Sequence, residues 1–530
     1  MYDYVIIGAG TAGCVLAARL SEDPDVTVCL LEAGPPDTAD TIHLPVGAFR
    51  MFRTHLDWDY STHEEPHLGR RRVYLPRGRV LGGSGSINTM VYIRGNRVDF
   101  DGWRQPGWGY DDLLPYFKLS EDNERGASAH HGVGGPLAVS EGRSENPSTA
   151  AFVEAATQAG YRRNDDFNGA EQDGFGAFQV TQRDGRRCST STAFLGPALD
   201  RPNLTVETHF QAHRVLVEHG RAAGVTGTRF EEPVTIRAAR EVVLCAGAYN
   251  SPQLLLLSGI GPAEELATHG IDVVLDQPGV GRNLQDHALV PLVFTHSQPV
   301  SLLTANRPEN VERYAAEGRG PLTANGPEVG GFVRTKAGLS APDVEFLAAP
   351  VMFADSGLQP PDRHAISFGP SMLTPRSRGS VTLVSSEPTA KPMIKHDYFA
   401  EESDLDDAVE ATRIGLEIAR QRALAPYNEA QFEPPASESD RDLREFIRLY
   451  AHSIFHPAGT CAMGEVVDAE LRVLGVDALR VVDASVMPTL VRGNPNAATI
   501  AIAEKAADLI RGKEMLSRAE EDLRKVDTLA

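Results

Sequence analysis

The sequence predicts an α/β fold with more than one domain, and three observations support this. The chain has 530 residues, too many for one ordinary core, since compact domains average roughly 150 residues. Its first part has the pattern strand, helix, strand, because apolar runs at 4–7 and 26–31 flank a segment with helical spacing at 11–20. Strand-like and helix-like segments then alternate along the chain. Sheets covered by helices are therefore expected.

The later elements are expected in the following order. A helix at 148–159 precedes strands at 204–207, 215–218, 234–237 and 242–245. The middle part, from 291 to 449, has strands at 344–347 and 380–383 and a helix at 405–422, and it is expected to form a separate layer. A strand at 479–482 and a helix at 496–510 follow. Residues 77–95 are rich in Gly, Pro and Arg and lack periodicity, so an extended loop with short helices is expected there.

Composition and charge exclude several classes of protein. Apolar residues make up 42% and charged residues 23%, which is typical of globular chains and not of disordered ones. The 51 basic and 72 acidic residues give a net charge of −21, which repels nucleic acid. Five scattered cysteines indicate neither a disulfide framework nor a Cys-based zinc site. No apolar run reaches the roughly 20 residues of a membrane span, and no signal peptide is recognisable, so a cytoplasmic location is expected.

One motif predicts a nucleotide site at the start of the chain. Gly8, Gly10 and Gly13 form GxGxxG directly after the first strand, and Glu32 ends the second strand. Such glycines allow a tight turn, a close approach of backbone amides to a pyrophosphate, and close packing of helix on strand. Glu32 is suited to accept a hydrogen bond from a ribose hydroxyl. The motif predicts a Rossmann-type dinucleotide site, disfavours NADP, and leaves NAD and FAD open.

Other motifs are less specific. Residues 82–88, GGSGSIN, would let a backbone pass close to a flat ligand, but a flexible loop has the same composition. Residues 63–67 spell HExxH, yet Pro66 is badly placed inside a helix, so no metal site is predicted. His456 precedes a Pro and Gly turn, where a structural role is the usual interpretation. Asn494 precedes a proline, and a turn or cap role is expected for it.

Several separated stretches together resemble one family, the glucose-methanol-choline (GMC) oxidoreductases. These are flavoproteins that include choline dehydrogenase and many alcohol oxidases. The matching stretches are residues 3–13 with Glu32, 77–95, 247–261 (GAYNSPQLLLLSGIG), 278–287 (PGVGRNLQDH), and 456–464 with 483–503. The resemblance spans residues 2–512 and implies FAD in place of NAD.

The resemblance implies a set of FAD-binding residues. The ADP half would be bound by Gly8, Gly10, Gly13 and Glu32, with the adenine end held by Val215. Along the pyrophosphate and flavin would lie Gly82, Gly83, Ser84 and Asn88, and the pyrophosphate or the ring would be approached by Asp483, Ala484, Asn496 and Thr499. Further contacts would come from Thr11, Ala12, Ala33, Arg79, Val91 and Ala246. Members with covalently attached flavin have a histidine where this chain has Ile87. The FAD is therefore expected to be non-covalent.

A catalytic pair, His456 and Asn496, is also implied by the resemblance, and the expected register favours Asn496 over Asn494. A base with a free pKa near neutrality is suited to take the hydroxyl proton of an alcohol while hydride passes from carbon to flavin N5. Asn496 would donate a hydrogen bond to the developing alkoxide. His452 is the next candidate for the base.

The substrate pocket is expected to be bordered by Met90, Ile454 and Phe455. Their apolar side chains favour uncharged aliphatic or aryl primary alcohols over choline, whose ammonium group would need an aromatic cage with a carboxylate. Glu345 is a candidate for that carboxylate, although an exposed strand residue is the expected interpretation.

The predicted function is FAD-dependent oxidation of a primary alcohol to the aldehyde, with electrons passed to O2 or to a quinone-type or dye-type acceptor. Choline dehydrogenase proper and a hydroxynitrile lyase on the same architecture are the alternatives. An NAD-linked dehydrogenase is disfavoured because only one dinucleotide fingerprint is present. The resemblance implies an FAD-binding domain at 1–147, 187–290 and 450–512, a substrate-binding domain at 148–186 and 291–449, and a C-terminal tail at 513–530.

Overall fold

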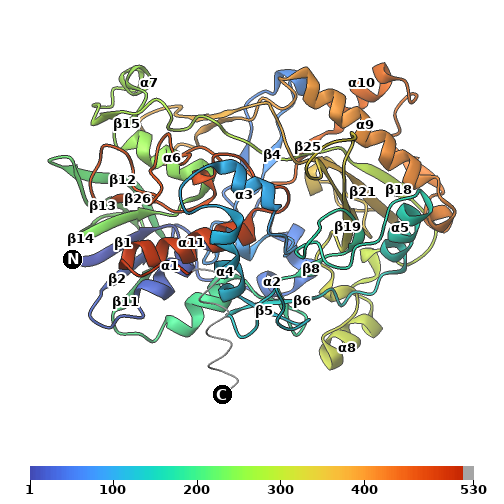
Figure 1. Ribbon diagram of the computed structural model, residues 1–530, viewed down its shortest axis with the longest axis horizontal. Helices are drawn as coiled ribbons and strands as arrows, with labels where there is room; N and C mark the ends of the chain where they lie inside the picture. The colour runs from blue at the N-terminus through green and yellow to red at the C-terminus, as the bar shows by residue number, and fades with distance from the viewer. Residues whose placement is uncertain (517–530) are drawn as a thin grey trace.

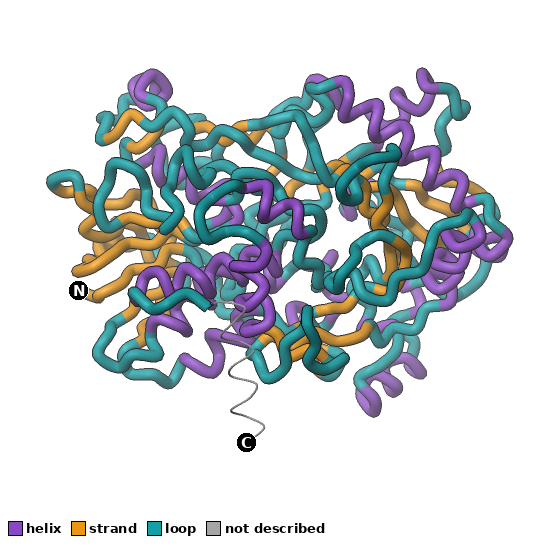
Figure 2. Tube along the Cα trace, viewed as in Figure 1, coloured by secondary structure: helices purple, strands orange, loops and turns teal. Residues whose placement is uncertain are grey.

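Two large β-sheets organise the computed structural model, which describes residues 1–516. They lie at opposite ends of the long axis, and loops and helices fill the space between them (Figures 1 and 2). Both sheets take strands from distant parts of the sequence. The α/β fold class expected from the sequence is confirmed.

The first sheet has a parallel core of the Rossmann type. It consists of β11 (Leu204–Glu207), β2 (Val28–Leu31), β1 (Tyr2–Ile7), the end of β14 (Glu232–Leu244) and β26 (Leu479–Val481). Val5 and Ile6 of β1 are fully buried, as expected for a parallel strand covered on both faces. β12 (Phe210–Glu218) and β13 (Arg221–Arg229) extend the sheet as an antiparallel meander with the first part of β14.

Three helices pack together beside this core. α1 (Thr11–Leu20) follows β1 directly and packs against α11 (Asn496–Arg511), which in turn contacts α4 (Tyr110–Ser120). Figure 1 shows α1 and α11, from opposite ends of the chain, next to each other. Their first residues meet, since Thr11 Oγ1 donates to Asn496 Oδ1 at 2.7 Å. Both amino ends are therefore close to the carboxyl end of β1, where a dinucleotide fold binds its ligand.

The second sheet is antiparallel. Its strands are β24 (Ala430–Phe432), β18 (Leu292–Thr295), β21 (Ala365–Met372), β20 (Val344–Ala349), β19 (Val329–Val333) and β7 (Gly174–Ala177), with β17 (Ala288–Leu289) joining β21 to β25 (His452–Ser453). Phe346 and Ala348 share an apolar cluster with Leu405 and Val409 of α9 (Glu402–Ala419). α5 (Pro147–Gln158) and α10 (Asp440–Tyr450) complete this outer layer.

Shorter elements connect the two layers. The helices are α2 (Asp40–His43), α3 (Arg97–Trp103), α6 (Gly247–Leu257), α7 (Ala263–Thr268) and α8 (Pro308–Glu317). The strands are β3 (Tyr60–Ser61), β4 (Tyr74–Leu75), β5 (Glu121–Asn123), β6 (Leu137–Glu141), β8 (Gln179–Val180), β9 (Gln182–Arg183), β10 (Arg186–Arg187), β15 (Ile260–Gly261), β16 (Leu275–Asp276), β22 (Ser380–Thr382) and β23 (Met393–Lys395). None of the helices within residues 1–516 has the length and apolar content needed to cross a membrane.

Two of the expected domain boundaries differ from the division between the observed sheets. β17 and β25 pair with the second sheet, whereas boundaries at 290 and 450 would assign them to the FAD-binding part. The division into two domains otherwise stays a prediction. Residues 517–530 of the expected tail lie outside the described part of the chain.

Candidate functional site

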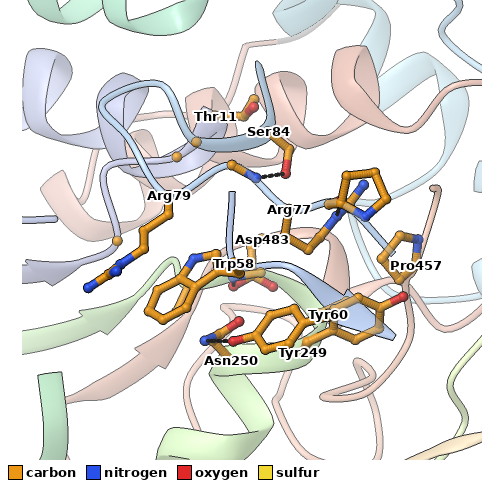
Figure 3. Close-up of a pocket in the computed structure, with 18 of the residues that line it drawn as sticks. Thr11, Trp58, Tyr60, Arg77, Arg79, Ser84, Tyr249, Asn250, Pro457 and Asp483 are labelled. Carbon is orange, nitrogen blue, oxygen red and sulfur yellow. Dashed lines mark hydrogen bonds between the residues drawn. The ribbon is translucent and has the colours of Figure 1, made fainter. Parts of the chain in front are cut away.

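A cavity of about 440 Å³ extends from the carboxyl end of β1 towards the second sheet. Figure 3 shows Thr11, Ser84, Arg77, Arg79 and Asp483 among the residues around it. Most of the residues expected to bind FAD line it, namely Gly8, Gly10, Thr11, Ala12, Glu32, Ala33, Arg79, Gly83, Ser84, Asn88, Val91, Ala246, Asp483, Ala484, Asn496 and Thr499. The structure therefore brings together segments from both ends and the middle of the chain.

The glycine motif has the backbone geometry of a pyrophosphate site. Gly8 has φ +99°, and a Cβ there would lie 2.6 Å from the Cys245 carbonyl oxygen. A Cβ on Gly13 would lie 1.9 Å from the Gly8 carbonyl oxygen, so only glycine lets α1 approach the loop this closely. Gly13 thus supports the turn without lining the cavity. The amino end of α1 faces the cavity, which favours an anion there.

Residues 82–88 form the facing wall. The short 3-10 helix Gly83–Ser86 packs directly on the glycine motif, because a Cβ on Gly83 would lie 2.6 Å from the Gly10 Cα. Ser84 and Asn88 line the cavity, whereas Gly82, with φ +85°, supports the turn from behind. Because this segment is packed tightly against the glycine motif, it forms a fixed wall of the cavity, and the interpretation as a flexible loop does not hold.

Glu32 is held by two backbone amides at the nucleotide end. The N–H of Ala9 donates to Oε2 at 3.0 Å, and the N–H of Gly34 donates to Oε1 at 2.9 Å. Burial raises the pKa of this carboxyl to about 7, although these amides oppose the shift. Glu32 lines the cavity with remaining acceptor capacity, as binding a ribose hydroxyl requires.

Replacing Glu32 with alanine is expected to weaken FAD retention by about 1.5–3 kcal/mol, because a charge-assisted hydrogen bond to the ribose is lost. Fluorescence titration of the apoprotein with FAD measures this loss. The fraction that stays loaded should keep its rate of flavin reduction, and Glu32→Gln serves as the control that keeps one acceptor oxygen. Loss of rate in the loaded fraction would show that Glu32 has another role.

The loop before α11 provides the last part of the nucleotide wall. Asp483 accepts hydrogen bonds from the N–H of Gly247 at 2.8 Å, from Ser251 Oγ at 2.6 Å and from the N–H of Ser485 at 2.8 Å. Asn496 and Thr499 stand in the first turn of α11 and line the cavity. Asp483 therefore joins the start of α6 to the short 3-10 helix Ala484–Val486 at the wall of the cavity.

The prediction for Val215 is not supported by its position. Val215 does not line the cavity, and its N–H donates to Ser258 Oγ at 2.8 Å. Phe210, Gln211 and Ala212, at the start of the same strand, line the cavity instead. The start of β12, and not Val215, therefore borders the cavity.

His456 stands at the other end of the cavity, buried among polar groups. Its Nε2 accepts a hydrogen bond from the Asn494 side-chain amide at 3.1 Å, and its Nδ1 lies 3.0 Å from His287 Nδ1. Because the amide nitrogen can only donate, the proton of neutral His456 is on Nδ1 and points to His287. Burial, His287 and Arg77 hold the pKa of His456 well below its usual 6.5. His456 is therefore neutral at physiological pH, with its Nε2 lone pair at the cavity.

The expected pairing of Asn496 with His456 is wrong. The Asn496 side-chain oxygen accepts a hydrogen bond from Thr11 Oγ1 at 2.7 Å, which places it at the pyrophosphate end. Asn494 is the asparagine beside His456, and it also lines the cavity. Pro495 lies between them and α11 begins at Asn496, so the two side chains leave the turn in different directions.

Asp286 is a functional residue that the sequence analysis missed. Its Oδ1 accepts the backbone N–H groups of His456 at 2.8 Å and of His287 at 2.9 Å, and its Oδ2 accepts hydrogen bonds from Tyr398 and Ser453. One buried carboxylate thus fixes the backbone of both histidines. The signal was present, because Asp286 and His287 end the matched stretch PGVGRNLQDH.

The end of the cavity next to His456 is apolar and aromatic. Met90, Ile454 and Phe455 line it as expected, together with Phe49 and Phe52. The rings of Phe52 and Phe455 meet edge to face at 5.9 Å, and those of Phe49 and Phe52 at 5.6 Å. His452, the alternative base, is buried with its Nδ1 at 2.7 Å from the Ser453 carbonyl oxygen and does not line the cavity.

Glu345 differs from the expectation of an exposed strand residue. It is fully buried, and neither carboxylate oxygen has a hydrogen-bond partner. Burial raises its pKa to about 8. It does not line the cavity, so it is not the carboxylate of a substrate cage.

These features define a class of protein, a dinucleotide-binding oxidoreductase fold whose cavity is lined by the glycine motif and Glu32 and also by His456. Models of GMC oxidoreductases match residues 2–289 and 375–503. The chain belongs to the GMC oxidoreductase family.

Named relatives agree with this assignment. The chain is 43% identical to an oxygen-dependent choline dehydrogenase of Brucella ovis, over 98% of this chain and 97% of the relative. It is 41% identical to a mitochondrial choline dehydrogenase of Homo sapiens, over 100% of this chain and 93% of the relative. The protein is thus an FAD-dependent alcohol oxidoreductase, with a small-molecule alcohol as substrate.

Solved structures show the same fold. Pyridoxine 4-oxidase from Mesorbium loti superposes with a TM-score of 0.89 at 32% identity, covering 97% of this chain and 100% of the other. A formate oxidase superposes with a TM-score of 0.89 at 28% identity, covering 96% and 98% of the two chains.

Proposed function

We propose that this enzyme oxidises an uncharged primary alcohol, aliphatic or aryl, to the aldehyde. The observation that supports this most strongly is the neutral His456, with its Nε2 lone pair turned to an aromatic, apolar end of the cavity. Bound FAD supplies the two-electron acceptor that takes hydride at N5. The residues lining the nucleotide end fit this cofactor, because glycine backbones, a helix end and Glu32 are complementary to pyrophosphate and ribose.

The chain's own groups have distinct roles in this reaction. The substrate hydroxyl would take the place of the Asn494 amide at His456 Nε2, and the imidazole would take its proton there. Asn494 would then donate to the alcohol oxygen as negative charge develops on it. Asp286 would keep the imidazole in position through the backbone of His456. Phe49, Phe52 and Phe455 would hold the apolar part of the substrate and exclude water.

Choline is the second candidate, favoured by the names of the relatives and by aromatic faces that can attract an ammonium group. The carboxylates that line the cavity oppose it. Within residues 1–516 these are Glu32, Asp57 and Asp483, and each already accepts backbone N–H groups. Glu32 and Asp483 lie at the nucleotide end, and the negative charge of Asp57 is already stabilised by the N–H groups of Arg53, Asp59 and Arg77 and by the Tyr74 hydroxyl, which opposes a role in binding a quaternary ammonium group.

An alcohol panel tests the proposal. Purified enzyme is mixed anaerobically with benzyl alcohol, a linear primary alcohol and choline, and flavin absorbance is followed. We expect rapid bleaching by the uncharged alcohols and slow or no bleaching by choline. The opposite order would favour choline dehydrogenase, and an oxidised flavin with all three would favour a lyase. Peroxide release and dye reduction in air then decide between O2 and another acceptor.

The cytoplasmic location also stays a prediction.

The FAD is proposed to be bound without a covalent link. Ile87 lines the cavity within an apolar cluster with Ile42, Met51 and Val80, and its side chain has no atom that can bond to the flavin. Acid denaturation is therefore expected to release all of the FAD into the supernatant. Yellow colour that remains on the precipitated chain would contradict this.

A further inference from the structure

Arg187 is a buried cation behind the wall formed by residues 82–88. It belongs to β10, and its side chain is 2% exposed. Its Nε donates to the Ile42 carbonyl oxygen at 2.7 Å, and its Nη1 donates to the Gly85 carbonyl oxygen at 3.1 Å and to Asn88 Oδ1 at 2.8 Å. All three acceptors are neutral.

No carboxylate of residues 1–516 forms an ion pair with Arg187, and its buried Nη2 has no hydrogen-bond partner. The other buried arginines of the described chain, Arg94 and Arg480, differ. Arg94 lies 2.6 Å from Glu121, and Arg480 lies 2.6 Å from Glu241. Burial alone lowers the pKa of Arg187 to about 9. An uncompensated cation in a dry site is costly, so a counter-charge from outside the chain is expected.

The position of Arg187 indicates which ligand supplies that charge. Asn88 lines the cavity and is followed by Thr89 and Met90 on the substrate side. Gly85 lies next to Thr11 and Asn496, at the pyrophosphate end. The guanidinium therefore donates directly to two residues of the wall along which the resemblance places the flavin. Because the guanidinium is buried, its interaction with a charge on the other side of this wall is screened much less than it would be in water.

We propose that Arg187 is an electrostatic positioning residue that stabilises the reduced, negatively charged flavin over the oxidised one and so raises the reduction potential of the bound FAD. This rests on the FAD assignment but not on the identity of the alcohol. Two other roles are conceivable, and they make different predictions. If Arg187 only paired with the pyrophosphate, it would increase the affinity for oxidised and for reduced FAD by the same factor. If its role were purely structural, its hydrogen bonds would only hold residues 82–88 in shape, and its charge would not matter.

The test is the reduction potential of FAD-loaded wild type, Arg187→Gln and Arg187→Lys, measured anaerobically against reference dyes without any alcohol. In Arg187→Gln we expect the equilibrium to move at least tenfold towards oxidised FAD, which is about 30 mV for a two-electron couple. Arg187→Lys keeps the charge and should recover most of that shift. Arg480→Gln removes another buried arginine, one that does not line the cavity and is paired with Glu241, and should leave the potential unchanged.

A variant that loads FAD poorly is tested through binding instead. Titration of the apoprotein with oxidised and with chemically reduced FAD gives two affinities, whose ratio reports the same free-energy difference whatever the overall affinity. We expect this ratio to change at least tenfold in Arg187→Gln. Equal weakening of both affinities would leave only the pyrophosphate role, and equal effects of Gln and Lys would leave only the structural role. Either result overturns the proposal. Failure of the alcohol panel would not affect this measurement.

Discussion

His456→Ala is expected to slow anaerobic flavin reduction by about 10²–10⁴-fold, because the group that takes the hydroxyl proton is removed. This corresponds to roughly 3–5 kcal/mol of activation free energy. Substrate affinity should change much less, since the binding surface of Phe49, Phe52 and Phe455 remains. Stopped-flow absorbance of the flavin measures the rate and its dependence on alcohol concentration.

The pH dependence gives an independent check of the same role. A base must be neutral to accept a proton, so the rate should rise with pH through the pKa of His456 and then become level. Burial, His287 and Arg77 lower that pKa well below 6.5, so the rising part of the profile should lie at lower pH than expected for a free imidazole. The ionisation should disappear in His456→Ala. A near-normal rate or an unchanged pH profile in this variant would exclude His456 as the base.

Asn494→Ala is expected to slow flavin reduction by about 10²–10³-fold, because a donor to the developing alkoxide is removed. The retention of FAD should be nearly unchanged. Rapid reduction at saturating alcohol, compared between wild type and variant, measures the effect.

Asn496→Ala is the matched control, since the same side chain is removed two residues away. Asn496 accepts from Thr11 at the pyrophosphate end. Its loss should therefore weaken FAD binding and leave the reduction rate of loaded enzyme within a few-fold of wild type. If Asn496→Ala slowed the chemistry more than Asn494→Ala, the assignment made from the structure would be reversed.

Much of the fold and of the nucleotide end follows from local sequence patterns. The order strand, Gly motif, helix, strand and Glu32 is contained in 32 consecutive residues, and the structure reproduces it as β1, α1 and β2. Each step depends on short-range chemistry, such as the turn that only glycine permits at Gly8. The remaining cofactor wall was placed by resemblance, and most of its residues line the cavity.

The errors arise where a small change of backbone direction decides the outcome. Asn494 and Asn496 are two residues apart, but α11 begins at Asn496, and the side chain of Asn494 contacts His456 whereas that of Asn496 contacts Thr11. Val215 was expected in place of Ala212, and the pairing of β12 shifts register between Ala212 and Arg214. Such an irregularity reverses which residues face the ligand, and periodicity alone does not reveal it.

Other features depend on contacts between distant segments. Glu345 is the one charged residue of β20, VEFLAA, but Phe346 packs into one apolar cluster and Leu347 against another, so both faces of the strand are covered and the polar position is buried as well. Asp286 owes its role to donors at 398, 453 and 456, all more than a hundred residues away. A single sequence shows the residue types and not this meeting of segments.

The central claim is that hydride leaves the carbon of a primary alcohol for the bound FAD while His456 takes the proton. Anaerobic mixing of FAD-loaded enzyme with benzyl alcohol and with its α-dideuterated form tests it most directly. The account predicts that both alcohols bleach the flavin, that the deuterated one does so several-fold more slowly, and that His456→Ala slows both. A flavin that stays oxidised with either alcohol, or that is bleached at equal rates whether or not His456 is present, would contradict it.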